Sequence, residues 1–246
     1  MLVAAALRPT PIGVRPVTVR ARLTLLRSFG LACDGCPVPL PPSAQRVLAF
    51  VALHERPVGR AYVAGSLWLD ATEERAHASL RSALWRIHRR GHRLVEPAGE
   101  QLALGQEVAV DLRESEVLAR RALDGADACD LDVDAAAFGS DLLPDWYDDW
   151  LVFERERYRQ LRLHALDALC ERLLAAGRLG DALDAALASV AGEPLRETAH
   201  RAVIRVHLAE GNVGEAIRQY RLCSHIFHEH LGIEPSARLR ELVPGC

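Results

Sequence analysis

The chain has 246 residues, of which 50% are apolar and 26% are charged. This composition fits one large or two modest globular domains and excludes a disordered chain. All 30 Lys and Arg positions are arginine, because the sequence contains no lysine. Mechanisms that need a side-chain amine, such as P-loop phosphate binding and Schiff-base chemistry, are therefore excluded.

The charge is divided unevenly along the chain. Residues 1–97 carry 14 Arg and 6 acidic residues, a net charge of +8, whereas residues 98–246 carry 16 Arg and 27 acidic residues, a net charge of −11. Such asymmetry is typical of a module that faces nucleic acid joined to one that does not. The alternative is chance in an Arg-rich genome.

Cysteines and apolar runs say little about a site. The six cysteines are widely spaced, and no secretory signal is present, so no disulfide framework is expected. No run of 18 apolar residues occurs, so we expect no membrane span and a cytoplasmic protein. Residues 1–20, with three prolines, are interpreted as a flexible tail or as the result of a misplaced start.

The first part begins with a hairpin signal. Residues 23–40 contain two extended runs around Asp34-Gly35, a dipeptide that favours a two-residue β-turn. Ser43 is then expected to cap a helix whose apolar residues recur at helical spacing until Pro57 ends it.

Two further helices and a second hairpin follow. A short helix is predicted over 60–68 and a longer one over 73–90, ended by Gly91. Residues 93–104 then predict two short strands around a turn at 97–99. Strands, three helices and a hairpin in this order indicate a winged helix-turn-helix.

The helix over 73–90 is the candidate recognition helix. At 100° per residue its apolar residues form one narrow stripe: Ala76, Leu80, Ala83, Leu84 and Ile87. The opposite face carries Arg75, Ala78, Ser82, Trp85, Arg86 and Arg89. No acidic residue occurs from Arg75 to Arg90, and an arginine-rich helix fits the DNA major groove. A merely solvated arginine face is the alternative.

The second part is predicted to be helical and repetitive. Gly177 and Gly211 lie 34 residues apart, as do Ala182 and Ala216, and 34 is the tetratricopeptide period. We expect at least two helical hairpins, and a third formed by residues 150–176 with earlier helices.

An acidic connector precedes the repeats. Residues 124–149 hold nine Asp and no Arg, and we expect this partly irregular segment to be packed by its aromatic residues Trp146, Tyr147 and Trp150. The predicted fold class is therefore mainly α with small β: a winged helix followed by tetratricopeptide-like hairpins.

Several segments together resemble a known family. They resemble the bacterial antibiotic-regulatory type (SARP-like) of transcriptional activator. The segments that carry the resemblance are the hairpin with PVPLPPSAQRVLAFVAL, SLW, ASLRSALWRIHRR, GDALDAAL, EPLRETAHR and LGIEPSARLREL. The resemblance covers about residues 23–243. It implies an OmpR-like winged helix over 21–108 and a bacterial transcriptional activation domain over 109–246, with promoter DNA and RNA polymerase as partners and a homodimer left open.

The resemblance also assigns roles to residues. The implied DNA contacts are Ser79, Ser82, Trp85, Arg86, Arg89 and Arg90. Ser82 and Arg86 would read bases, and Trp85 would lie against sugar or a thymine methyl, or against a partner. The loop from Leu69 to Glu74, with Asp70, Glu73 and Glu74, matches the loop through which OmpR-like proteins touch RNA polymerase.

Two positions depart from the pattern of that family. Its hairpin often presents Gly-Tyr where this chain has Gly99-Glu100, and its recognition helix often carries Arg where this chain has His88. We therefore expect weaker contact between this hairpin and phosphate.

Other constellations are interpreted as structural or incidental. Cys33 and Cys36 bracket a hairpin turn, and no second pair follows to complete a zinc site. The histidines at 200, 207, 225, 228 and 230 are expected to be surface residues, and Asp148 and Asp149 to be solvated loop carboxylates. No enzyme, metal or cofactor is predicted; a thiol oxidoreductase is the least favoured reading.

A second function remains open at this point. The chain would be a helical adaptor if its winged helix served docking or dimerisation instead of DNA binding. The acidic majority of the chain favours that alternative.

Overall fold

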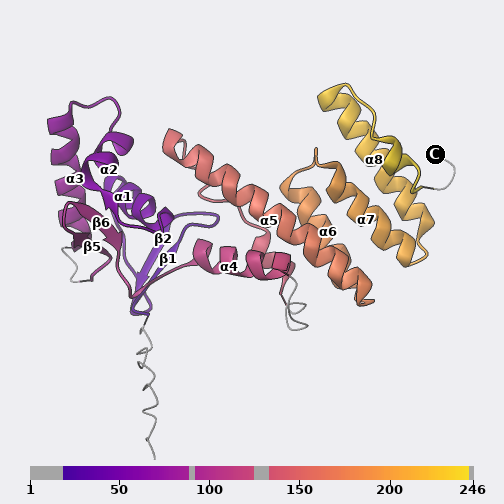
Figure 1. Ribbon diagram of the computed structural model, residues 1–246, viewed down its shortest axis with the longest axis horizontal. Coiled ribbons are helices and arrows are strands. Elements are labelled where there is room, and N and C mark those ends of the chain that lie inside the picture. The colour runs from indigo at the N-terminus through magenta and orange to yellow at the C-terminus, as the bar shows by residue number, and fades with distance from the viewer. Residues whose placement is uncertain (1–18, 89–91, 125–132, 244–246) are drawn as a thin grey trace, which may run out of the picture.

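The computed structural model describes residues 19–88, 92–124 and 133–243. It shows a small mixed part with sheets and three helices, followed by an array of longer helices (Figure 1). The elements of the first part are β1 (Ala21–Thr24), β2 (Gly30–Cys33), β3 (Cys36–Pro37), α1 (Pro42–Leu53), β4 (Val58–Gly59), α2 (Arg60–Leu67), α3 (Glu73–His88), β5 (Val95–Ala98), β6 (Gln101–Leu104) and β7 (Val108–Val110). Those of the second part are α4 (Asp111–Asp124), η2 (Ala135–Phe138), α5 (Asp149–Ala175), α6 (Leu179–Gly192), α7 (Glu197–Ala209), α8 (Val213–Leu231) and α9 (Ala237–Arg240).

The first sheet has the strand order β3-β2-β1-β7, with β7 parallel to β1 and the other pairs antiparallel. The predicted hairpin turn at Asp34-Gly35 is confirmed. Both residues have positive φ, 46° and 81°, as a tight two-residue turn requires, and Cys33 faces Cys36 across it.

Helix α1 begins two residues earlier than expected. The residue before its first turn is Pro41, and the helix starts at Pro42, so the prediction that Ser43 caps it is wrong. Proline suits this position because its φ is already helical and no N–H is needed there. The helix ends at Leu53, ahead of Pro57 as expected.

The second hairpin, here called the wing, consists of β5 and β6. Its turn lies at Gly99-Glu100, later than the predicted Pro-Ala-Gly turn, because Pro97 and Ala98 are part of β5. Gly99 has a φ of +64°, which only a residue without Cβ adopts easily. Strand β4 pairs with β6 and so joins the wing to the start of α2.

The two parts of the chain share one hydrophobic core. The cluster that contains α1 to α3 and the first sheet also takes in Leu142, Leu143, Leu151 and Tyr158, all buried. Two smaller clusters lie between the helices of the second part. The winged helix therefore buries part of its apolar surface against residues more than thirty positions beyond its last strand.

Asp111 marks the point where the chain passes from β7 into α4. Its carboxylate accepts hydrogen bonds from the backbone N–H groups of Leu25, Leu26 and Leu112, at 2.8, 3.1 and 2.7 Å. Burial nevertheless raises the pKa of this carboxyl group above its ordinary value. This residue ties the end of β1 to the start of α4.

The acidic connector is packed by two of its three predicted aromatic residues. Trp146 stacks on Phe29, with 5.9 Å between the ring centroids, and Trp150 lies edge-on to Phe50, with 5.1 Å between the ring centroids. Tyr147 is 94% exposed, so the expectation that it packs the connector is wrong. The two indoles already fill the space against the winged helix, and the intervening side chain points away.

The 34-residue repeat is confirmed in the geometry of two helix ends. Gly177 and Gly211 have φ values of 73° and 79°. The residues after them donate N–H groups to the carbonyls of Leu173 and His207, at 2.9 and 2.8 Å. This is the Schellman ending, in which a left-handed glycine closes the helix and turns the chain. Helix α5 packs on both α4 and α6, which provides the third expected hairpin.

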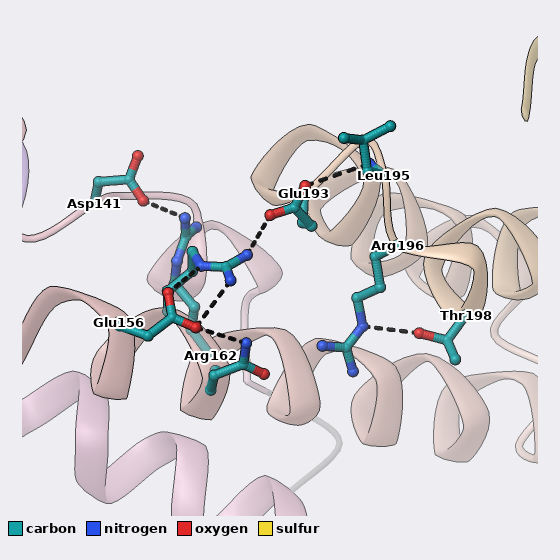
Figure 2. Close-up of polar contacts among 9 residues, drawn as sticks. Asp141, Glu156, Arg162, Glu193, Leu195, Arg196 and Thr198 are labelled. Atoms are coloured by element: carbon teal, nitrogen blue, oxygen red, sulfur yellow. Dashed lines mark hydrogen bonds and ion pairs between the residues drawn. The ribbon is translucent and has the colours of Figure 1, made fainter. Parts of the chain in front are cut away.

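The EPLRE segment (residues 193–197), where α6 ends and α7 begins, forms polar contacts with neighbouring helices of the repeats. Glu193 pairs with Arg159 of α5, and Arg196 donates to Asp167 of α5 at 2.8 Å (Figure 2 shows Glu193 and Arg196). Glu197 accepts hydrogen bonds from the backbone N–H and hydroxyl of Ser236, in the LGIEPS segment. Both family-like segments therefore have a structural role.

Candidate nucleic-acid interface

Helix α3 separates its apolar side chains from its charged ones. All five residues of the predicted apolar stripe are buried: Ala76, Leu80, Ala83, Leu84 and Ile87. They lie in the same core cluster as Val47 and Leu48 of α1. Burial of this stripe fixes which face of the helix points to solvent.

The opposite face of α3 is open to solvent. Four of the predicted DNA contacts lie on it, all exposed except the first, which is partly so: Ser79, Ser82, Trp85 and Arg86. Trp85 is 61% exposed, a large fraction for an indole. Arg89 and Arg90, the other two predicted contacts, lie outside the described residues.

The charge of this face is positive. From Arg75 to His88 the helix has no acidic residue, and its acids, Glu73 and Glu74, are confined to the first turn. Arg86 lies in the last turn, where a cation interacts favourably with the helix dipole. Helices α6 to α8 do not cover this face, because α3 lies at one end of the molecule and they lie at the other (Figure 1).

Arg86 has one weak hydrogen-bond partner among the residues that the structure describes. Its Nη1 donates to the hydroxyl of Ser43 at 3.3 Å, near the long limit for a hydrogen bond. A guanidinium has five N–H donors, so this contact orients the side chain and leaves most of its donors available. This role of Ser43 could not be predicted from the sequence, because the two residues lie 43 positions apart.

His88, one of the two departures from the family pattern, fixes the wing. Its Nε2 donates to the backbone carbonyl of Val95, the first residue of β5, at 2.7 Å. The ring thereby ties the end of α3 to the start of the wing. That role had no sequence signal either, since it depends on how the chain returns after α3.

The wing itself carries acidic residues. Glu96 is partly exposed and Glu100, at the turn, is exposed, while no basic residue occurs from Leu94 to Leu112. The carbonyl of Glu100 accepts the N–H of Arg60 at 3.0 Å, so the wing tip lies beside the start of α2. Hydrogen bonds to α2 and α3 hold the wing in place, but its strands β5 and β6 carry no cation that could pair with a phosphate.

The loop between α2 and α3 projects acidic and apolar side chains. Asp70, Glu73 and Glu74, the predicted polymerase contacts, are exposed. Leu69 beside them is 69% exposed. The structure thus brings these predicted residues together at the end of α3 that is remote from Arg86.

Cys33 is buried, and burial, with a smaller effect of Asp34, raises the pKa of its thiol, which disfavours the reactive thiolate. Among the residues described, no group of three or more His, Cys, Asp or Glu is placed to hold a metal ion. In the same part of the chain, no helix is long and apolar enough to span a membrane.

Two expectations about polar residues are wrong. His200 is fully buried, although it was expected at the surface; its Nε2 donates to the carbonyl of Pro194 and its Nδ1 accepts from Gln219, both at 2.8 Å. Burial lowers the pKa of this imidazole. Asp148 is not simply solvated, because it pairs with Arg46 at 2.5 Å.

Comparison with known proteins gives two matches. The model of the family described as bacterial transcriptional activator domain matches residues 107–244, more than half of the chain. No curated protein is significantly similar in sequence. Among solved structures, the fold is similar to that of Mycobacterium tuberculosis EmbR in complex with a low affinity phosphopeptide, with 22% identity and a TM-score of 0.69.

The match to EmbR covers 91% of this chain and 64% of that chain, so this chain spans less than two thirds of its length. The likeness confirms the predicted fold class, a small β-containing part followed by a helical part. The family match confirms the predicted resemblance to the antibiotic-regulatory type of activator. The chain belongs to the bacterial transcriptional activator domain family.

Proposed function

We propose that the chain is a sequence-specific DNA-binding transcriptional activator that works in the cytoplasm. Residues 21–108 form the DNA-binding domain in this proposal, and residues 109–246 form a domain that binds protein. The observation that supports it best is the exposed, acid-free face of α3 between Arg75 and His88. An α-helix with such a face fits the major groove of B-DNA, which is about 12 Å wide.

Each residue of the face has a role in this proposal. Arg86, with Ser82 beside it, reads base edges, because arginine pairs bidentately with guanine. Ser79 and Arg89 contact bases or phosphate, and Arg90 contacts phosphate. Trp85 lies against sugar or a thymine methyl. The wing approaches the neighbouring backbone, and the loop that holds Asp70, Glu73 and Glu74 contacts RNA polymerase.

Selection of bound sequences from a random duplex pool tests this function directly. The full chain is expected to enrich one sequence, and its footprint measures whether one or two half-sites are covered, and thus whether a homodimer binds. The helical-adaptor alternative, favoured by the exposed Trp85 and the acidic wing, predicts no salt-dependent binding to any duplex.

Substitution of Arg86 tests the assignment of the groove-facing side. We expect Arg86→Ala to reduce discrimination between the selected site and its guanine substitutions by about 1 to 3 kcal/mol. Arg81→Ala is the control: it removes the same charge from the flank of α3, and is expected to leave base preference unchanged. The measurement is competition binding against single-base variants of the selected site; equal base preference in Arg86→Ala and the unmodified chain would contradict the assignment.

A further inference from the structure

A cleft of about 490 Å³ lies between the α2–α3 loop and the residues that lead into α5. Leu69 and Asp70 line it from the loop, and Tyr147 and Asp149 line it from the α5 side. We call it the α2–α5 cleft. It is formed by two segments almost eighty residues apart in sequence, one from each part of the chain.

Large apolar side chains surround this cleft without being buried. Tyr147 is 94% exposed and Leu69 is 69% exposed, although both line the cleft. Phe153, 83% exposed, lies four residues after Asp149 and therefore on the same face of α5. Exposed apolar groups gathered at one place mark an interaction site more often than isolated ones do. The fold does not need them, since Trp146 and Trp150 already pack this region.

The charge around the cleft is negative. Asp70, Asp149 and, at the start of α3, Glu73 and Glu74 are all exposed. Of the two arginines that line the cleft, Arg46 is neutralised by Asp148 at 2.5 Å and also donates to the carbonyl of Leu67 at 2.8 Å. Only Arg75 adds an exposed positive charge. This surface repels DNA and is complementary to a basic protein segment.

We infer that the α2–α5 cleft binds a segment of RNA polymerase in which a large apolar side chain lies between Arg or Lys residues. The apolar side chain would lie against Leu69, Tyr147 and Phe153, and the basic residues would pair with the surrounding carboxylates. This inference rests on the proposed function and extends it. The polymerase contact is made by the first turns of α5 together with the α2–α3 loop, so both parts of the chain contribute.

The experiment measures recruitment of purified bacterial RNA polymerase holoenzyme to a duplex that carries the selected site beside a core promoter. The double substitution Tyr147→Ala with Phe153→Ala removes only exposed side chains. We expect it to leave affinity for the duplex alone unchanged and to weaken recruitment by about tenfold, as loss of an aromatic anchor does at protein interfaces. Leu222→Ala, on α8 and 45% exposed, is the control and is expected to recruit normally.

A second pair of variants tests the charge. Asp149→Arg is expected to weaken recruitment more than Asp149→Asn, and the difference is expected to shrink as the salt concentration rises. Equal recruitment by the two variants at low salt would overturn the charge complementarity.

The outcomes separate this inference from the proposed function. If Asp70→Asn with Glu73→Gln weakens recruitment and the double aromatic variant does not, the contact is confined to the loop, and the inference is overturned while the proposed function stands. If neither weakens it, the proposed polymerase contact also fails. If the unmodified chain is a dimer and the double aromatic variant a monomer, the cleft joins two copies of the chain, and the inference is again overturned.

Discussion

Glu100 stands at the tip of the wing, where a DNA-binding hairpin would meet the phosphate backbone. Under the proposed function its carboxylate repels the duplex, because no cation of the wing offsets it. Two unit charges 10 Å apart in water interact by about 0.4 kcal/mol, a factor of about two in affinity. The acidic wing then lowers affinity for all sequences alike and leaves discrimination to α3.

We therefore expect Glu100→Gln to raise affinity for a random duplex about twofold at low salt. Glu229→Gln, on α8, changes the net charge equally at a site remote from α3. We expect Glu229→Gln to raise affinity for the random duplex less than Glu100→Gln does. Titration of both variants at two salt concentrations is the measurement, and equal gains would show that net charge alone is responsible.

His200 makes stability depend on pH. Its pKa in the folded chain is lowered by burial, whereas in the unfolded chain the group titrates near its ordinary value of 6.5. Below pH 6.5 the unfolded chain binds a proton that the folded chain does not, so the free energy of unfolding decreases as the pH falls. The contribution of neutral, buried His200 to the free energy of unfolding is fully present above pH 6.5 and is lost progressively below it.

The substitution His200→Gln keeps a donor for Pro194 and an acceptor for Gln219 but does not titrate. We expect its free energy of unfolding to decrease less than that of the unmodified chain between pH 7.5 and pH 5.5, because the substituted side chain takes up no proton on unfolding. Urea unfolding at both pH values measures the difference. Equal losses would mean that His200 takes up its proton in the folded chain.

At the scale of the elements, two glycines three residues apart in the second repeat have opposite requirements. Gly211 has a φ of +79°, where a Cβ is strained, whereas Gly214 lies in α8 with nothing within 4 Å of an added Cβ. We expect Gly211→Ala to lower the free energy of unfolding by about 1 kcal/mol and Gly214→Ala to raise it by about 0.5 kcal/mol. Denaturant unfolding of the two variants checks both signs, and destabilisation by Gly214→Ala would contradict the second.

Elements with a local signal could be predicted from the sequence. The hairpin at Asp34-Gly35, the buried stripe of α3 and the glycine endings of the repeat all depend on residues close together in the chain, and all are confirmed. The side of α3 that faces solvent follows from the same periodicity.

Features that depend on distant partners could not be predicted. Tyr147 and Trp146 are neighbours in one acidic segment, and only the position of Phe29 decides that the indole is packed and the phenol is exposed. The residue type of Ser43 predicts a helix cap, but Pro42 already starts the helix. The hydrogen bond that Nδ1 of the buried His200 accepts likewise comes from a distant residue, Gln219, nineteen positions away.

For the whole molecule, the shared core couples the two parts in folding. Leu151 is fully buried in the cluster that also holds α1, although it belongs to α5. We expect Leu151→Ala to lower the free energy of unfolding by about 2 to 5 kcal/mol and to reduce hydrogen-exchange protection in α1 as well as α5. Leu187→Ala, on α6 and 45% exposed, is the control. Unchanged protection of α1 in Leu151→Ala would show that the parts unfold independently.

The joint between the parts also has a consequence for promoter architecture. Asp111 and the Arg46–Asp148 pair hold α4 and α5 against the winged helix, so the α2–α5 cleft cannot rotate independently of α3. B-DNA completes a turn in about 10.5 base pairs. Under the proposed function, lengthening the spacer between operator and promoter by about 5 base pairs would move the cleft to the far side of the duplex, and about 10 would return it. Activation is then expected to follow the helical phase of the binding site.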